Sequence, residues 1–86
     1  MPELSRFYGI TIKMYHGDHP TPHFHVEYAE NRAKFSLHPL EVVKGEVPSR
    51  VRSLVLEWAA EHLDELEADW RLCQSGRVPN PIKPLD

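Results

Sequence analysis

The 86-residue chain is 41% hydrophobic and 27% charged, which is typical of one small folded domain and excludes a largely disordered chain. Ten Lys and Arg against 13 Asp and Glu give a formal net charge of -3, which argues against broad nonspecific nucleic-acid binding but allows a local basic face. No apolar run approaches the roughly 20 residues of a membrane-spanning helix, no signal-peptide pattern is present, and the single Cys73 cannot form an internal disulfide. We therefore expect a cytoplasmic protein with no membrane contact.

The first half of the chain has the alternation of apolar and polar side chains that is typical of half-buried strands. Strands are predicted over residues 8–15, 23–28 and 33–38, with a further short strand or hairpin over residues 40–47. Residues 16–22 contain two prolines, which withhold backbone donors, and therefore predict a loop between the first two strands.

The second half has the pattern of an amphipathic helix, because apolar side chains recur at three- and four-residue steps over residues 51–73. Ser49 is a candidate N-cap and Gly76 a candidate stop. A straight helix over residues 50–75 would be about 39 Å long, whereas a compact domain of this size is only about 30 Å across. We therefore expect a kink or joint near His62.

Together these elements predict an α+β fold, in which an antiparallel sheet of three to four strands carries a C-terminal helix, or two helices, on one face. We expect a single domain over residues 1–76. The proline-rich tail over residues 77–86 should be extended, either lying over the domain or directed toward a partner. If neighbouring strands pair in sequence order, the other face of the sheet is uncovered. The side chains predicted to share this face are Lys13, His23, His25, Glu27, Lys34, Ser36 and His38.

Three segments of the chain resemble a known family. They are Pro2-Glu-Leu-Ser-Arg-Phe-Tyr-Gly9, His19-Pro-Thr-Pro-His-Phe-His-Val-Glu-Tyr28, and Leu56-Glu-Trp58 followed by His62, Glu65, Leu66 and Trp70. With them the chain is similar, over nearly its whole length, to the small prokaryotic proteins called domain of unknown function 4160. The resemblance implies no particular reaction. It does imply a component of a two-protein module of the toxin–antitoxin kind, whose partner protein is encoded nearby.

Four of the six histidines, at positions 16, 19, 23 and 25, lie within ten residues and suggest a metal site. His23 and His25 are two residues apart on one predicted strand, so their imidazoles point the same way and could chelate one ion. His19 would complete a three-histidine zinc site with an open coordination position, and Glu27 is an alternative third ligand. No defined zinc motif is present. We therefore expect no cofactor, with a divalent metal such as zinc as the alternative.

The same face suggests a small endoribonuclease, because cleaving RNA without a metal needs a base, an acid and cations near the phosphate. The candidate catalytic residues are His23, His25, His38 and Lys13. The candidate RNA contacts are Lys34 and Arg32 for phosphates and Tyr15 or Tyr8 for stacking on a base. The acidic net charge speaks against this hypothesis.

A non-enzymatic adaptor or antitoxin is the third hypothesis. It requires the helical region to project, so that its acidic flank and the tail form a surface for a partner protein or a second copy of the chain. The opposing reading is that Trp58 and Trp70, on one helical stripe, are core residues. In that reading His62 is a hydrogen-bonded, partly buried histidine and Cys73 a packing residue.

Overall fold

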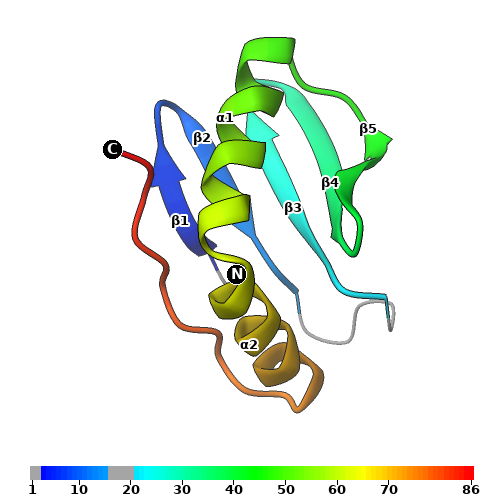
Figure 1. Ribbon diagram of the computed structural model, residues 1–86, viewed down its shortest axis with the longest axis vertical. Coiled ribbons are helices and arrows are strands. Elements are labelled where there is room, and N and C mark those ends of the chain that lie inside the picture. Colours follow the sequence, from blue (N-terminus) through cyan, green and yellow to red (C-terminus); the bar gives the residue numbers. More distant parts are fainter. Residues whose placement is uncertain (1–2, 16–20) are drawn as a thin grey trace.

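The computed structural model describes residues 3–15 and 21–86, and shows a five-stranded sheet with two helices (Figure 1). The strands are β1 (Glu3–Phe7), β2 (Ile10–Lys13), β3 (His23–Tyr28), β4 (Asn31–Leu37) and β5 (Leu40–Gly45), and the helices are α1 (Ser49–Glu61) and α2 (Leu63–Gln74). All neighbouring strands are antiparallel and follow one another in sequence order. The predicted α+β architecture is therefore confirmed, and the predicted three to four strands become five.

The extra strand is β1, which the alternation pattern does not reveal. Leu4 and Ser5 are both buried although they are consecutive, because the register with β2 shifts between Glu3 and Ser5. The predicted start of the next strand at Tyr8 is wrong, since Tyr8 and Gly9 form the turn between β1 and β2 with φ angles of 51° and 77°. Positive φ at both central residues is what the type I′ two-residue hairpin turn requires.

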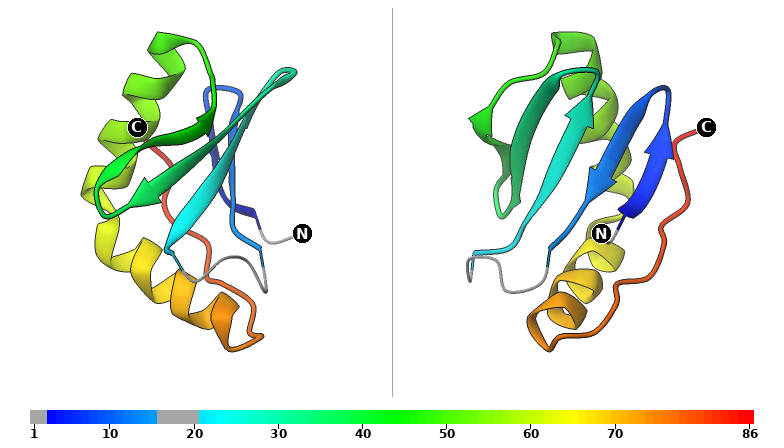
Figure 2. Two further views of the ribbon diagram at one scale, coloured as in Figure 1. Left: turned by 90° about the vertical axis from the view of Figure 1, so that its right-hand side faces the viewer. Right: turned by 180° about the vertical axis from the view of Figure 1, so that it is seen from behind.

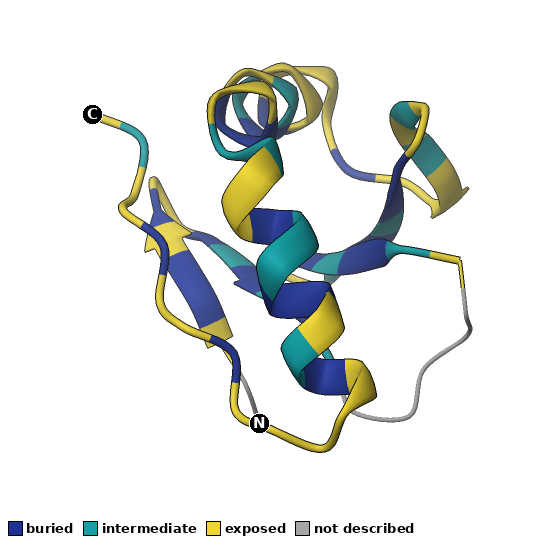
Figure 3. Cartoon of the chain, turned by 60° about the horizontal axis from the view of Figure 1, so that its bottom comes forward, coloured by how far each residue is buried: buried dark blue, intermediate teal, exposed yellow. Residues whose placement is uncertain are grey.

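Both helices pack on the same side of the sheet and enclose one core (Figure 2). Ile10, Ile12, Phe24, Val26 and Phe35 point from the strands toward this side and are completely buried. The inner sides of α1 and α2 are buried in turn, whereas their outer sides are exposed (Figure 3). Trp58 and Trp70 are core residues, as the helical stripe predicted. Cys73 is likewise a buried packing residue.

The helical region is broken at His62, where we expected a joint. α1 has 13 residues and α2 has 12, and the longest dimension of the domain is 33 Å, too short for one straight helix of about 39 Å. Gly76 ends α2 as predicted: its φ is +79°, and Arg77 N–H donates to Leu72 O as in a Schellman motif. The predicted N-cap is wrong, because Pro48 occupies that position and no side chain caps the helix. None of the described helices is long and apolar enough to span a membrane.

The C-terminal tail lies over the domain as a strap. Ile82 N–H donates to Leu4 O at 2.7 Å, so the tail runs beside β1, the first edge strand. The Trp58 indole N–H donates to Lys83 O at 2.9 Å, and Asn80 N–H donates to Asp69 Oδ1 at 2.8 Å. The tail thus contacts β1, α1 and α2, and of the two predicted arrangements the structure has the one that covers the domain.

Candidate functional site

The face of the sheet turned away from the helices is the candidate functional site, here called the open face. The view from behind looks onto it, and no described helix lies in front of the strands (Figure 2, right). Its side chains come from alternate positions of all five strands, with Arg6 of β1 opposite Thr11 and Glu41 of β5 opposite Ser36. The polar ones with at least partial exposure include Thr11, Lys13, His25, Glu27, Arg32, Lys34 and Lys44.

A row of basic side chains crosses four strands of the open face. The pairing register places Lys13 opposite His25, His25 opposite Lys34, and Lys34 opposite Lys44. Directly opposite residues on antiparallel strands point to the same face, with Cβ atoms about 4.5–5.5 Å apart. Three lysines and one histidine therefore form one line across the sheet, here called the basic row.

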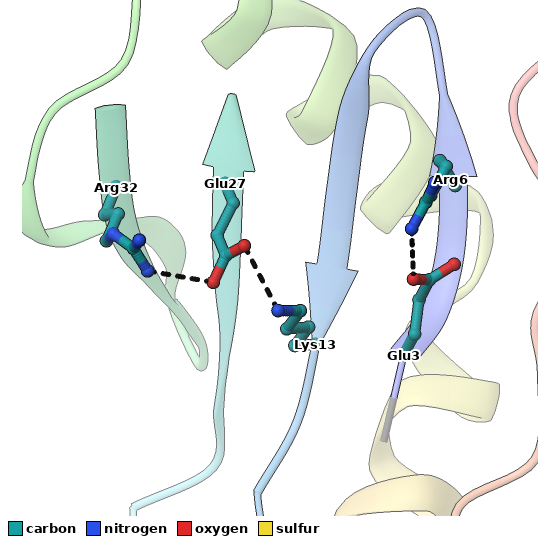
Figure 4. A network of polar contacts seen from close by, with 5 residues as sticks. All are labelled: Glu3, Arg6, Lys13, Glu27 and Arg32. Carbon is teal, nitrogen blue, oxygen red and sulfur yellow. Dashed lines mark hydrogen bonds and ion pairs between the residues drawn. The ribbon is translucent and has the colours of Figure 1, made fainter. Parts of the chain in front are cut away.

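Glu27 provides part of the counter-charge for these cations. One of its carboxylate oxygens lies 3.1 Å from Lys13 Nζ and the other 3.1 Å from an Arg32 guanidinium nitrogen (Figure 4). The Lys13 and Glu27 side chains are 18% and 24% exposed, so this pair is less screened than an ordinary surface pair. No described carboxylate lies within ion-pair distance of Lys34 or Lys44. Lys34 and Lys44 are thus the two lysines of the basic row without a described counter-charge.

His23 does not share the open surface with His25, contrary to our expectation. It is only 3% exposed, because Trp70 of α2 packs against its ring with centroids 5.0 Å apart. Its Nδ1 lies 2.8 Å from Thr21 O, so this nitrogen carries a proton that it donates to the carbonyl. Ser36, opposite His23, is also buried and donates to Pro39 O. This end of the predicted face is closed.

His25 is half-buried and is the histidine that the structure keeps on the basic row. Its ring meets the edge of Tyr15, with centroids 4.6 Å apart, and that of His23 at 5.1 Å. Tyr15, His25 and His23 therefore form a continuous aromatic contact. Within it, His23 is enclosed while Tyr15 and His25 are partly accessible.

His38 was expected to join His23 and His25, but the structure pairs it with α2. Its Nε2 lies 2.6 Å from a carboxylate oxygen of Glu67, and its side chain is 60% exposed. It follows the end of β4, where the chain turns into β5, so strand alternation no longer determines its direction. His38 and His23 therefore do not form the predicted acid–base pair, because His38 contacts Glu67 and His23 is buried.

The predicted metal site cannot be assembled from what the structure describes. His16 and His19 lie outside the described residues, and among residues 3–15 and 21–86 no group of three His, Cys, Asp or Glu side chains is placed to hold a metal ion. His62 is hydrogen-bonded as predicted, with its Nδ1 2.6 Å from a Glu65 carboxylate oxygen. Burial raises the pKa of the Asp69 carboxyl, but this group lies at the strap and not on the open face.

Lys44 is the member of the basic row that sequence reasoning missed. Strict alternation along β5 would place Lys44 with Val42, which faces the core side opposite Phe35. The register shifts between Lys34 and Phe35, and this bulge returns Lys44 to the open face beside Lys34. The adjoining Gly45, with a φ of +74°, was the available signal for an irregular strand end.

Comparison with known proteins identifies a family for this chain. The family model described as "Domain of unknown function (DUF4160)" matches residues 9–71, which include the whole basic row and the Trp70 that encloses His23. No curated protein and no solved structure gives a significant match.

Proposed function

The chain belongs to the DUF4160 family, and from this premise we propose that it is a toxin–antitoxin component of the prokaryotic cytoplasm that binds RNA through its open face and works with a partner protein encoded nearby. The observation that carries the RNA part of the proposal is the basic row. A chain with a net charge of -3 has placed three lysines in one line on the side of the sheet that its helices leave uncovered. Such a local concentration of cations is what phosphate contacts need.

Single-stranded RNA fits this face better than a duplex. Lys34 and Lys44 would contact phosphates, since neither has a described carboxylate partner, and Arg32 would add a contact shared with Glu27. Tyr15, just beyond the end of β2, and His25 on β3 offer partly exposed aromatic rings on which an unpaired base can stack. Stacking and phosphate contacts together bind single strands with little sequence preference.

Binding is favoured over cleavage by the positions of the histidines. General acid–base catalysis needs two proton-transfer groups within reach of the same phosphate. His25 could serve as one, and Lys13 could offset phosphate charge, but His23 is enclosed by Trp70 and His38 is held by Glu67. The proposal therefore gives the open face a binding role, and RNA cleavage through His23, His25 and His38 becomes an outcome that the test can reveal.

RNA binding can be measured by fluorescence anisotropy of a labelled 12-nucleotide RNA at several salt concentrations. We expect a linear fall of the logarithm of affinity with that of salt, and a loss of at least tenfold in affinity when Lys34 and Lys44 are both replaced by alanine. The matched control is Arg52→Ala with Arg71→Ala, which removes two exposed cations from the helices. If both double variants lost RNA affinity equally, the interaction would be nonspecific charge attraction, and the proposal would be overturned. Gel analysis of the same samples would reveal cleavage.

The partner part of the proposal predicts that the product of the adjacent gene copurifies with the chain and reverses growth arrest caused by its expression. If the chain is instead an antitoxin or adaptor, the neighbour alone arrests growth and the chain relieves the arrest. A Lys34→Ala, Lys44→Ala variant that keeps the complex but loses the growth effect would connect the open face to the biological activity. Unchanged growth in every combination would contradict the toxin–antitoxin role.

Metal binding by His19, His23 and His25 is the alternative proposal. Its support is the contact of the His23 and His25 rings, 5.1 Å apart, at the start of β3, four residues after His19 in the sequence. Titration of the purified protein with zinc decides between the RNA-binding and the metal-binding proposals. His25→Ala is the test variant and His62→Ala is the control. Stoichiometric zinc binding that only the first substitution removes would favour the metal.

A further inference from the structure

The β4–β5 end of the open face contains a hollow of about 340 Å³. It is lined by His25, Arg32, Ala33, Lys34, Lys44 and Gly45. The four larger side chains are cationic or can become so. The other two residues, Ala33 and Gly45, are small. Among residues 3–15 and 21–86, no acidic residue lines it.

Lys34 and Lys44 both line this hollow and lie side by side, as directly opposite residues in the register of the β4–β5 pair. Like charges placed directly opposite on neighbouring strands destabilise a sheet. Within the described part of the chain, neither ammonium group has a carboxylate within ion-pair distance, since Glu27 is engaged by Lys13 and Arg32. The fold therefore maintains an electrostatic repulsion here that a bound anion would relieve.

The backbone of β5 has an irregular path that places Lys44 opposite Lys34 at the hollow. The bulge in β5 turns Lys44 toward Lys34, and Gly45 follows directly with a φ of +74°. A Cβ at Gly45 would lie 2.3 Å from Arg32 O, so only glycine fits where β5 closes onto β4. The opposed lysines thus depend on a specific backbone path and not on the chance placement of two flexible side chains.

We propose that this hollow is a phosphate-binding site, in which the ammonium groups of Lys34 and Lys44 contact one phosphate group from two sides and Arg32 and His25 donate hydrogen bonds to it. The inference deepens the proposed RNA-binding function and rests on it for the identity of the natural ligand. The binding chemistry is that of a phosphate oxyanion between two cations. Its source is either an internal phosphodiester of RNA or a terminal phosphate monoester.

The first test uses inorganic phosphate and pyrophosphate on the full chain at constant ionic strength, with chloride as the balancing anion. Titration calorimetry and the thermal midpoint are measured for the wild type, Lys44→Ala, Lys34→Ala and the control Arg52→Ala. We expect millimolar phosphate to raise the midpoint of the wild type and the control, and both lysine variants to bind at least tenfold more weakly. In chloride alone, Lys44→Ala should have a higher midpoint than the wild type because the repulsion is gone.

The result that overturns the inference is an equal phosphate response in Lys44→Ala and Arg52→Ala, since phosphate then acts as a general stabilising salt. A lower midpoint of Lys44→Ala in chloride would likewise contradict it, because the two lysines would not repel. The substituted side chains are exposed at Lys44 and Arg52 and half-buried at Lys34, and circular dichroism verifies that all three variants fold.

The second test separates the two phosphate sources and the two proposals. RNA oligonucleotides with a 5′-phosphate or a 5′-hydroxyl are compared for their affinity and for their competition with pyrophosphate. A terminal site predicts at least tenfold preference for the 5′-phosphate, whereas an internal site predicts equal affinities that pyrophosphate competes away. If neither pyrophosphate nor the Lys44→Ala substitution changes the RNA affinity, the phosphate site in the hollow is refuted and the proposed RNA-binding function is retained. If phosphate binds through the two lysines but RNA does not bind, the proposed RNA-binding function is refuted and the phosphate site is retained.

Discussion

The strap and the open face of this small domain differ in how their polar groups are partnered. Under the strap, Trp58 donates to Lys83 O and Asp69 accepts from Asn80, so the described polar contacts join the tail to the helices. On the open face, Lys34 and Lys44 are placed against each other with no described counter-charge. The polar contacts of the strap hold the tail on the domain, whereas the open face keeps a pair of like charges that costs stability. Such costs are typical of surfaces retained for binding.

The largest effect that this difference predicts is at Trp58. Its side chain is completely buried between the sheet and the strap, contacting Phe7 at a ring-centroid distance of 5.5 Å. Trp58→Ala should lower the free energy of unfolding by about 3–5 kcal/mol, measured by urea denaturation. Trp58→Phe, which keeps a ring but loses the bond to Lys83 O, should cost less than Trp58→Ala. If Trp58→Ala cost no more than removing an open-face side chain, the division of roles between the two sides would be wrong.

Asp69 tests the strap with a smaller effect. Its side chain is 2% exposed, Oδ1 accepts from Asn80 N–H, and Oδ2 has no hydrogen-bond partner among the described residues. Asp69→Ala should lower the free energy of unfolding by about 1–3 kcal/mol at acidic pH, where the carboxyl is neutral and only the acceptor is lost. Asn80→Ala is the matched control because it keeps the backbone donor.

The pH dependence of the Asp69 effect has a definite sign. Burial raises the pKa of the Asp69 carboxyl, and the nearby Glu65 carboxylate raises it further, while the bond from Asn80 lowers it. A carboxyl whose pKa is raised on folding binds its proton more tightly in the folded state. Its contribution to stability is complete below its unfolded pKa and is lost as the pH rises through the raised folded pKa. The advantage of the wild type over Asp69→Ala should therefore shrink with increasing pH, and a constant difference would contradict the burial of a titrating carboxyl.

Most of the fold follows from local patterns, and its exceptions have local causes. β3 begins and ends where alternation predicted, and the joint at His62 follows from comparing helix length with domain size. β1 was missed because its register shift makes Leu4 and Ser5 consecutive buried residues, which breaks the period of two on which strand prediction depends.

The candidate site is less predictable, because its departures from the pattern come from residues distant in sequence. Lys13, His25 and Lys34 lie on the open face as alternation predicted. His23 is removed from it by Trp70, and His38 by Glu67, and both of these partners lie on α2. Only the packing of that helix against the sheet decides these two contacts, so strand periodicity has no information about them.

Glu27 tests the open face, where a substitution should change binding more than stability. Glu27→Gln removes the carboxylate charge that neutralises Lys13 and Arg32 but keeps nearly the same size. We expect the free energy of unfolding to fall by about 1 kcal/mol or less, because each such pair contributes little. RNA affinity should rise about two- to tenfold at low salt, since two more cations become available to phosphates. Glu57→Gln, at an exposed position on α1, is the control, and weaker RNA binding by Glu27→Gln would show that Glu27 orients the cations instead of competing for them.

The smallest effect is expected at His38, whose position decides whether the open face extends to the end of β4. Its side chain is 60% exposed and its contact with Glu67 is at the surface, so His38→Ala should change the free energy of unfolding by only a few tenths of a kcal/mol. Because Glu67 holds the imidazole toward α2, the same variant should bind RNA with unchanged affinity in the anisotropy assay. Glu67→Gln serves as the companion variant, since it frees His38 without removing it. A tenfold loss of affinity in His38→Ala that Glu67→Gln does not share would place His38 on the RNA-binding surface, and the boundary between the two sides of the domain would then lie beyond β4.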